Sequence, residues 1–221
     1  MNVLARLDEA RSACSVLGHP FYKRWSAGEL SAAELERYAG EYRHAVVALA
    51  EASASAAAKA GPAHASGLRA HAEEETAHVE LWDDFVRATG AREATGGEVA
   101  LDETLTCAQA WTAGESLLEH LAVLYAIEAS QPEVSKTKLE GLTEHYGYSD
   151  EGPALEYFRL HELRDVEHAR AAGALIEELL EGREDAQAQA DRMVARADAA
   201  LRGNWQLLDG VEAVDAGSAG A

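Results

Sequence analysis

The chain has 221 residues, 48% of them hydrophobic and 26% charged, and its formal net charge is −20. That length and composition fit one globular domain with a full core. The negative charge argues against a nucleic-acid partner, because phosphate binding needs clustered lysine and arginine, and it also argues against docking on anionic lipid. No apolar run approaches the roughly 20 residues that cross a bilayer, so we expect no membrane partner.

The N-terminal segment and the two cysteines indicate the compartment. The segment is amphipathic and contains Asp8 and Glu9, whereas a secretory signal peptide has a basic head and an unbroken apolar stretch. Cys14 and Cys107 are isolated and form neither a CxxC motif nor a disulfide framework. We therefore predict a cytoplasmic protein in which both thiols are small buried residues.

Helical periodicity extends along most of the chain. Apolar residues recur at spacings of three and four, which is typical of amphipathic helices. Ser31 and Glu34 match a capping box at the start of a long helix, and Gly61 and Pro62 follow its end. In chain order, the predicted helices span residues 2–17, 21–28, 31–60, 64–88, 102–111, 115–130, 133–146, 154–180 and 184–202.

The pattern does not indicate strands or repeats. No alternating β-branched run is bounded by hairpin turns, and no unit of 20–50 residues recurs. We predict an all-α bundle of about seven or eight helices, with residues 1–204 as one domain and 205–221 as a partly flexible tail. Residues 91–101 are predicted to form a loop.

One helix carries a spacing that suits a metal ion. His161, Asp165 and His168 stand at i, i+4 and i+7, so they share one helix face. Two imidazoles and a carboxylate on one face can converge on one ion. The alternative is a solvated face with incidental histidines.

An earlier helix offers a second set. Glu75 and His78 are one turn apart, and Glu-x-x-His on inward-facing helices is the spacing of carboxylate-bridged di-iron bundles. His71 and Glu74 lie on the same face, so either is a further candidate ligand. The alternative is that three consecutive glutamates simply form a solvated face.

Glu128 is a third candidate, because it stands near the end of a largely apolar helix. A buried carboxylate needs a cation or hydrogen bonds, and Tyr125 one turn earlier is a candidate donor. The alternative is an exposed glutamate. Together the three motifs supply three carboxylates and three imidazoles: Glu75, His78, Glu128, His161, Asp165 and His168.

This mixed nitrogen and oxygen set narrows the choice of metal. Structural zinc sites favour cysteine and four closed ligands, and magnesium or calcium favours oxygen alone. Imidazole plus carboxylate with open positions suits non-haem iron or manganese. The sequence has no nucleophile elbow and no phosphate-cradling glycine loop.

Several short motifs resemble those of the haem-oxygenase-like di-iron oxidases and oxygenases, a superfamily with the TenA/PqqC-type seven-helix fold. The resemblance covers about residues 1–182. The motifs are His19-Pro-Phe-Tyr-x-x-Trp25, Tyr-x-x-x-Tyr-x-His44, Glu75-x-x-His78-x-x-Leu-Trp82-x-x-Phe85, Glu128, Lys138-x-x-Gly-Leu-x-x-His-Tyr146-Gly147 and His161-x-x-x-Asp165-x-x-His168.

The resemblance implies that the six residues hold one or two non-haem irons that activate O2. Glu75, Glu128 and Asp165 would also be the catalytic groups. Members oxidise small aliphatic or amino-acid-like substrates, often in biosynthetic pathways, and a homodimer is plausible for the fold. Relatives include fatty-acid-decarboxylase-like and CADD-like proteins, and a self-consuming branch that forms an aminobenzoate.

The chain departs from the commonest form of this superfamily in one place. Many relatives carry glutamate seven residues before the histidine that matches His78, where this chain has His71; others use the Glu-x-x-His spacing found at Glu75. We therefore expect one tightly held iron near His78, His161 and His168, and one labile iron that depends on Glu128 and Asp165.

The self-consuming branch places an oxidisable tyrosine beside the metal. Ile127 stands where such a tyrosine would directly precede Glu128, so Tyr38, Tyr42 and Tyr125 are the remaining candidates. Lys138, ten residues after Glu128, is a candidate to point toward the site; the alternative is a surface lysine.

Two alternative functions, from other classes of protein, compete with that of an iron oxygenase. Thiaminase-type TenA hydrolysis on the same fold needs a nucleophilic cysteine, and neither cysteine has local charge to activate it. A non-enzymatic regulatory or interaction protein is the other alternative, although the charge of −20 offers no DNA-binding face. The iron content of the purified protein separates the iron enzyme from both.

Overall fold

The computed structural model describes residues 2–91 and 100–218, and these residues are helical without any strand. The predicted all-α class is therefore confirmed, and the described α-helices number nine rather than seven or eight. They are α1 (Val3–Ala13), α2 (Pro20–Ser26), α3 (Ala32–Lys59), α4 (Ala65–Thr89), α5 (Asp102–Thr112), α6 (Leu117–Glu128), α7 (Gln131–Glu144), α8 (Glu156–Leu180) and α9 (Ala186–Ser218). Short 3₁₀ turns span Val16–Gly18 and Pro153–Leu155.

Local sequence signals explain where the helices begin and end. The Ser31 side chain accepts a hydrogen bond from the Glu34 N–H, and the Glu34 carboxylate accepts one from the Ser31 N–H at 2.7 Å. This is the predicted capping box, and it satisfies two N–H groups that the helix leaves free. Gly90 ends α4 with a φ of 85°, a left-handed conformation that glycine adopts without strain. Most of the predicted loop over 91–101 lies outside the described residues.

The last helix differs from the prediction. We place its end near residue 202 from the sequence, with a flexible tail from residue 205, but α9 continues to Ser218. Leu207, Leu208 and Val211 are fully buried, so this part of the helix belongs to the core. The predicted tail begins too early because the glycines and small residues in this segment make its apolar periodicity difficult to recognise in the sequence.

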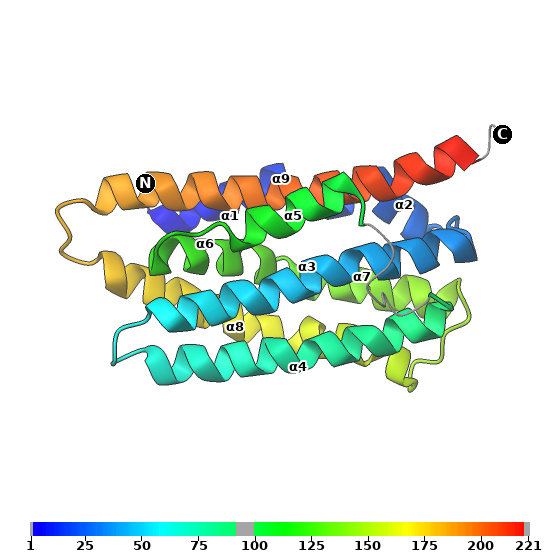
Figure 1. Ribbon diagram of the computed structural model, residues 1–221, viewed down its shortest axis with the longest axis horizontal. Coiled ribbons are helices and arrows are strands. Elements are labelled where there is room, and N and C mark those ends of the chain that lie inside the picture. Colours follow the sequence, from blue (N-terminus) through cyan, green and yellow to red (C-terminus); the bar gives the residue numbers. More distant parts are fainter. Residues whose placement is uncertain (1, 92–99, 219–221) are drawn as a thin grey trace.

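The long helices lie side by side along the longest axis of the molecule (Figure 1). Consecutive helices α3 and α4 form an antiparallel pair, and α9 packs against α5 and α6. α6 also packs against α8, which runs antiparallel to α4. This arrangement brings the inward faces of α4, α6 and α8 together.

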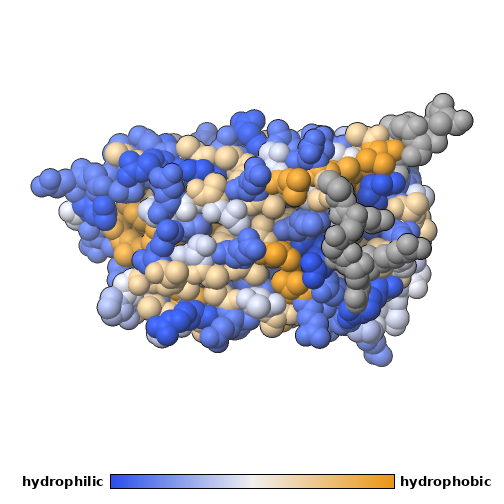
Figure 2. Space-filling model, viewed as in Figure 1, coloured by the Kyte–Doolittle hydropathy of each residue, from blue (hydrophilic) through white to orange (hydrophobic). Residues whose placement is uncertain are grey.

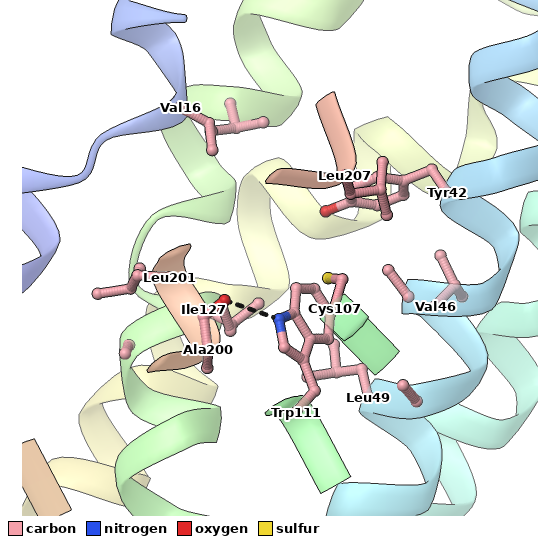
Figure 3. Close-up of a cluster of buried hydrophobic side chains, with 14 of the residues drawn as sticks. Val16, Tyr42, Val46, Leu49, Cys107, Trp111, Ile127, Ala200, Leu201 and Leu207 are labelled. Atoms are coloured by element: carbon pink, nitrogen blue, oxygen red, sulfur yellow. Dashed lines mark hydrogen bonds between the residues drawn. The ribbon is translucent and has the colours of Figure 1, made fainter. Parts of the chain in front are cut away.

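Large aromatic side chains fill the core between these helices. Trp25, Trp82 and Trp111 are almost completely buried. Each indole N–H donates to a backbone carbonyl of another helix, which for Trp111 is that of Ala200 in α9. Figure 3 shows Trp111 and its bond to Ala200 beside Cys107. Buried indoles with satisfied N–H groups lock neighbouring helices together.

The visible surface is mostly hydrophilic. Hydrophilic residues predominate on the face in Figure 2, and apolar residues occur there in small areas. In the part of the chain that the structure describes, no helix is both long enough and apolar enough to span a membrane.

Candidate metal centre

The structure brings the six predicted ligands together in the interior, and His71 joins them. His71, Glu75 and His78 come from α4, Glu128 from α6, and His161, Asp165 and His168 from α8. Among the described residues, each of the seven has at least one buried nitrogen or oxygen without a hydrogen-bond partner of good geometry. So many orphaned polar atoms at one place are costly unless a cation binds them.

Three donors form a first group: Glu75, His78 and His161. Nδ1 of His78 lies 3.2 Å from Oε1 of Glu75, and the His78 and His161 rings lie 4.6 Å apart between centroids. All three side chains are buried, and their donor atoms lie within 4.8 Å of one another. A single ion can therefore reach all three.

A second group contains Glu75 again, with His71, Glu128 and His168. Nε2 of His71 lies 3.0 Å from Oε1 of Glu128 and 3.6 Å from Oε1 of Glu75. Nδ1 of His168 lies 3.7 Å from the same Glu75 oxygen. The donor atoms again lie within 4.8 Å of one another, so Glu75 is common to both groups.

Asp165 lies beside the second group. Its Oδ1 is 3.5 Å from Nδ1 of His168, and neither of its oxygens has a hydrogen-bond partner within the described chain. The grouping thus differs from our sequence expectation, because His168 lies with Glu128 rather than with His78 and His161. Glu74, the other open candidate, points away from the groups toward Arg164.

The second nitrogen of each α8 imidazole has its own partner. Nδ1 of His161 donates to the backbone carbonyl of Tyr157 at 2.7 Å, which leaves Nε2 facing the centre. Nε2 of His168 contacts the Glu74 carboxylate at 3.1 Å, which leaves Nδ1 facing the centre. Such partners fix the tautomer and the ring orientation of a metal ligand.

Burial and charge strongly perturb these groups. Burial raises the pKa of Glu128, and it raises the pKa of Asp165 to about 7. Burial lowers the pKa of His161 to about 4. Burial would also lower the pKa of His71, but the Glu128 and Glu75 carboxylates outweigh it and raise the value to about 10. Perturbed groups clustered in one place are typical of a functional site.

The donor set fits a divalent transition metal. Two donors at about 2.1 Å from one ion, placed at right angles, are about 3.0 Å apart, which is close to the separations of 3.0–3.7 Å found here. Imidazole together with carboxylate is the ligand chemistry of non-haem iron.

Lys138 is completely buried and close enough to His161 for its charge to add to the effect of burial in lowering the pKa of that imidazole, so the surface-lysine alternative is wrong. Its Nζ lies 4.7–5.6 Å from the centroids of five rings, which we call the lysine cage: Tyr22, Tyr38, Tyr42, Trp82 and Phe158. Burial lowers its pKa to about 7. The described residues give Nζ no hydrogen-bond partner.

The tyrosine candidates separate clearly in the structure. Tyr38 and Tyr42 belong to the lysine cage, whereas the Tyr125 hydroxyl donates to Asp8 at 2.9 Å on a half-exposed side. Sequence reasoning missed Tyr22 of the cage, and it missed Tyr157, whose ring stacks on His161. The i, i+4 spacing from Tyr157 to His161 is the signal that could have found the latter.

A cavity of about 550 Å³ opens between α4, α6 and α8. His71 and His168 form part of its wall, and Leu121, Leu124 and Leu175 are among its apolar lining residues. This size is within the usual range of small-molecule sites. The second donor group is therefore reached from a cavity, whereas His161 is fully buried.

The cysteines do not supply a nucleophile. Cys107 is completely buried, and burial raises the pKa of its thiol. Cys14 is partly buried, and burial raises its pKa as well. Both shifts favour the unreactive thiol over the thiolate, which removes support from the thiaminase-type alternative.

Comparisons with known proteins connect the chain with iron-containing redox enzymes. A family model described as "Iron-containing redox enzyme" matches residues 36–202. A 4-aminobenzoate synthase of Chlamydia muridarum is 34% identical over 89% of this chain and 87% of its own length. A protein of the same name from Nitrosomonas europaea is 29% identical over 93% of this chain and 89% of its own.

Solved structures show the same fold. A TenA homologue from Pseudomonas syringae has a TM-score of 0.80 at 16% identity and covers 95% of this chain and 90% of its own. A haem-oxygenase-like domain from Shewanella denitrificans has a TM-score of 0.77 at 19% identity and covers 99% of this chain and 93% of its own. The chain therefore belongs to the family of iron-containing redox enzymes, and it is an iron oxidoreductase with the haem-oxygenase-like fold.

Proposed function

We propose that this chain uses non-haem iron and O2 to form 4-aminobenzoate. The relatives from Chlamydia muridarum and Nitrosomonas europaea carry that activity in their names and align with about nine tenths of the chain. The observation that carries the proposal is that two metal-donor groups share Glu75 and lie beside a lysine that is buried among tyrosine rings.

The six ligands predicted from the sequence would hold two ferrous ions, with Glu75 shared between them. Bound iron would supply the electrons that activate O2. The chain's part is to hold the imidazoles in fixed orientations and to keep the donors buried. Asp165, whose carboxylate oxygens have no hydrogen-bond partner in the described chain, lies 3.5 Å from Nδ1 of His168 and would be a further carboxylate ligand.

The lysine cage supports a product ring that comes from the chain itself. 4-Aminobenzoate is a benzene ring with nitrogen and carbon at opposite positions, and a tyrosine ring carries oxygen and carbon at opposite positions. The cage places three tyrosine rings around one amine. We infer that a cage tyrosine provides the ring of the product and that the Lys138 amine is the source of its nitrogen.

Isotope labelling tests this source directly. Protein made with ring-labelled tyrosine is loaded with Fe(II) and given a reductant and O2, and the product is analysed by mass spectrometry. We expect ring-labelled 4-aminobenzoate at no more than one molecule per chain. Protein made with nitrogen-labelled lysine shows whether the amine is transferred. Iron-loaded protein that consumes O2 without forming 4-aminobenzoate would overturn the proposal.

Matched variants locate the ring. Tyr22→Phe, Tyr38→Phe and Tyr42→Phe each remove one phenol of the cage, and we expect one of them to abolish the product. Tyr148→Phe is the control, because Tyr148 packs against Phe85 outside the cage. Equal product from all three cage variants would contradict a ring supplied by the cage.

The cavity favours a second candidate function, the oxidation of an external small molecule. Its apolar lining and its contact with His71 and His168 suit a small substrate with an apolar body. Unlabelled 4-aminobenzoate from ring-labelled protein would favour this candidate. Cytoplasmic location, a homodimer and a small-molecule partner stay predictions.

A further inference from the structure

We propose that His71 is a metal ligand, so that each of two ions receives one histidine from α4 and one from α8. This inference rests on the iron site of the proposed function. It adds a donor to the predicted set and assigns a four-histidine, three-carboxylate centre to this chain.

The sequence contains the same spacing twice. α4 carries His71, Glu75 and His78 at i, i+4 and i+7, and α8 carries His161, Asp165 and His168 at the same spacing. Because i, i+4 and i+7 share one face of a helix, each helix presents histidine, carboxylate and histidine in a row.

Because α4 and α8 are antiparallel, the two rows run in opposite directions, and the start of one row lies opposite the end of the other. The last histidine of the α4 row, His78, faces the first of the α8 row, His161, with ring centroids 4.6 Å apart. His71 faces His168 with centroids 4.3 Å apart. The two histidine pairs are thus similarly spaced, with ring planes 73° apart in the first pair and 48° apart in the second.

The position of the His71 donor atom agrees with ligation. Its Nε2 lies 3.0 Å from Oε1 of Glu128 and 3.6 Å from Oε1 of Glu75, in the same group as Nδ1 of His168. Without His71, the second ion would have one imidazole where the first has two. Glu128 from α6 joins only the second group, so the centre is symmetric in its imidazoles and asymmetric in its carboxylates.

The competing role for His71 is that of an ion-pair partner. In that case His71 neutralises Glu128 and occupies the space of the second ion, and the chain holds one iron only. The two roles give opposite results when His71 is removed, because loss of a ligand weakens metal binding and loss of a blocking group improves it.

Anaerobic titration of the metal-free full chain with Fe(II) distinguishes the roles. We expect the unchanged chain to bind two equivalents of Fe(II). His71→Ala should bind the second equivalent at least 10-fold more weakly, the usual loss when metal-site groups are removed. His71→Glu should keep the second equivalent, because carboxylate is also a ligand. His64→Ala is the control, because His64 lines the same cavity and pairs with Glu178 outside the donor groups.

A second readout counts the imidazoles. With Co(II) in place of iron, pulsed electron paramagnetic resonance detects each coordinated ring nitrogen, and His71→Glu should remove one of four. A His71→Ala variant that binds two equivalents as tightly as the unchanged chain, or more tightly, would overturn the inference.

Failure of the inference differs from failure of the proposed function. If the unchanged chain and His161→Ala both bind no Fe(II), the iron site itself is wrong. If the unchanged chain binds iron and His161→Ala loses it, while His71→Ala does not, only the role of His71 is wrong. Thermal unfolding of each metal-free variant confirms that it is folded.

Discussion

The imidazole of His161 lies against the phenol ring of Tyr157, with ring centroids 3.9 Å apart and ring planes 24° apart. The same imidazole donates from Nδ1 to the Tyr157 backbone carbonyl, so its orientation depends on the backbone as well as on the stack. Tyr157→Phe should therefore keep iron binding unchanged. Tyr157→Ala should destabilise the fold by about 3–5 kcal/mol through the lost buried ring and should weaken iron binding. Urea unfolding and iron content measure both effects; loss of iron in Tyr157→Phe would contradict the backbone anchor.

Removing donors from one group at a time tests whether Glu75 is shared. His161→Ala should lose one Fe(II) equivalent and Glu128→Ala the other, because each belongs to one donor group. Glu75→Ala should lose both. Anaerobic titration provides the measurement, with His145→Ala, at the end of α7, as the control. A Glu75→Ala chain that still binds one equivalent tightly would show that the groups are independent.

Glu74 should position His168 from outside the donor groups. Its carboxylate contacts Nε2 of His168 at 3.1 Å and accepts two N–H groups of Arg164 at 2.7 and 3.2 Å. Glu74→Ala should weaken one Fe(II) equivalent by about 10–100-fold, the usual effect of such a partner. Glu74→Gln keeps an acceptor oxygen and should lose less. Glu167→Ala, which removes an exposed partner of Arg170, should change nothing.

The buried Lys138 amine should make stability depend on pH. Its pKa is about 7 in the folded chain and near 10.5 when unfolded. Between these values the unfolded chain binds the extra proton, so the free energy of unfolding rises with pH by up to about 1.4 kcal/mol per pH unit. Below pH 7 both states are protonated and the penalty of the buried charge is complete.

Lys138→Met removes that penalty. The metal-free variant should be more stable than the unchanged chain at pH 6, and the difference should shrink toward pH 10. Urea unfolding at several pH values measures it. Lys136→Met, on the exposed side of α7, should show no such trend. A difference that stays constant with pH would indicate packing rather than charge.

Two glycines inside helices should respond in opposite ways to alanine. A Cβ at Gly141 would lie 2.5 Å from Cδ1 of Trp25, because α7 approaches α2 closely there. Gly141→Ala should destabilise the fold by about 1–3 kcal/mol. Gly40→Ala meets nothing within 4 Å and should stabilise α3 by up to about 1 kcal/mol, as alanine is the better helix former. Equal melting temperatures would contradict both expectations.

The helices, and the fact that the six candidate ligands lie together, could be predicted from the sequence because both depend largely on local spacing. Residues four and seven apart share a helix face whatever the rest of the chain does, so His161, Asp165 and His168 could be grouped without coordinates. The same rule put His71 and Glu74 on the face of Glu75 and His78, but spacing alone could not decide between these two further candidates.

Relations between helices could not be predicted in this way. That His168 lies with Glu128 rather than with His78 depends on how α4, α6 and α8 pack against one another. The lysine cage draws rings from α2, α3, α4 and α8, and no local pattern around Lys138 indicates it. Burial of a lysine amine is decided by tertiary packing alone.

The donors are spread over helices that are made at different times. A growing chain that has emerged only through α6 presents His71, Glu75, His78 and Glu128, without any imidazole from α8. Since both donor groups need a histidine from α8, iron can be held firmly only after that helix has been synthesised and has packed against α4. If the chain oxidises its own side chains, as proposed, that reaction has to wait until α8 is in place.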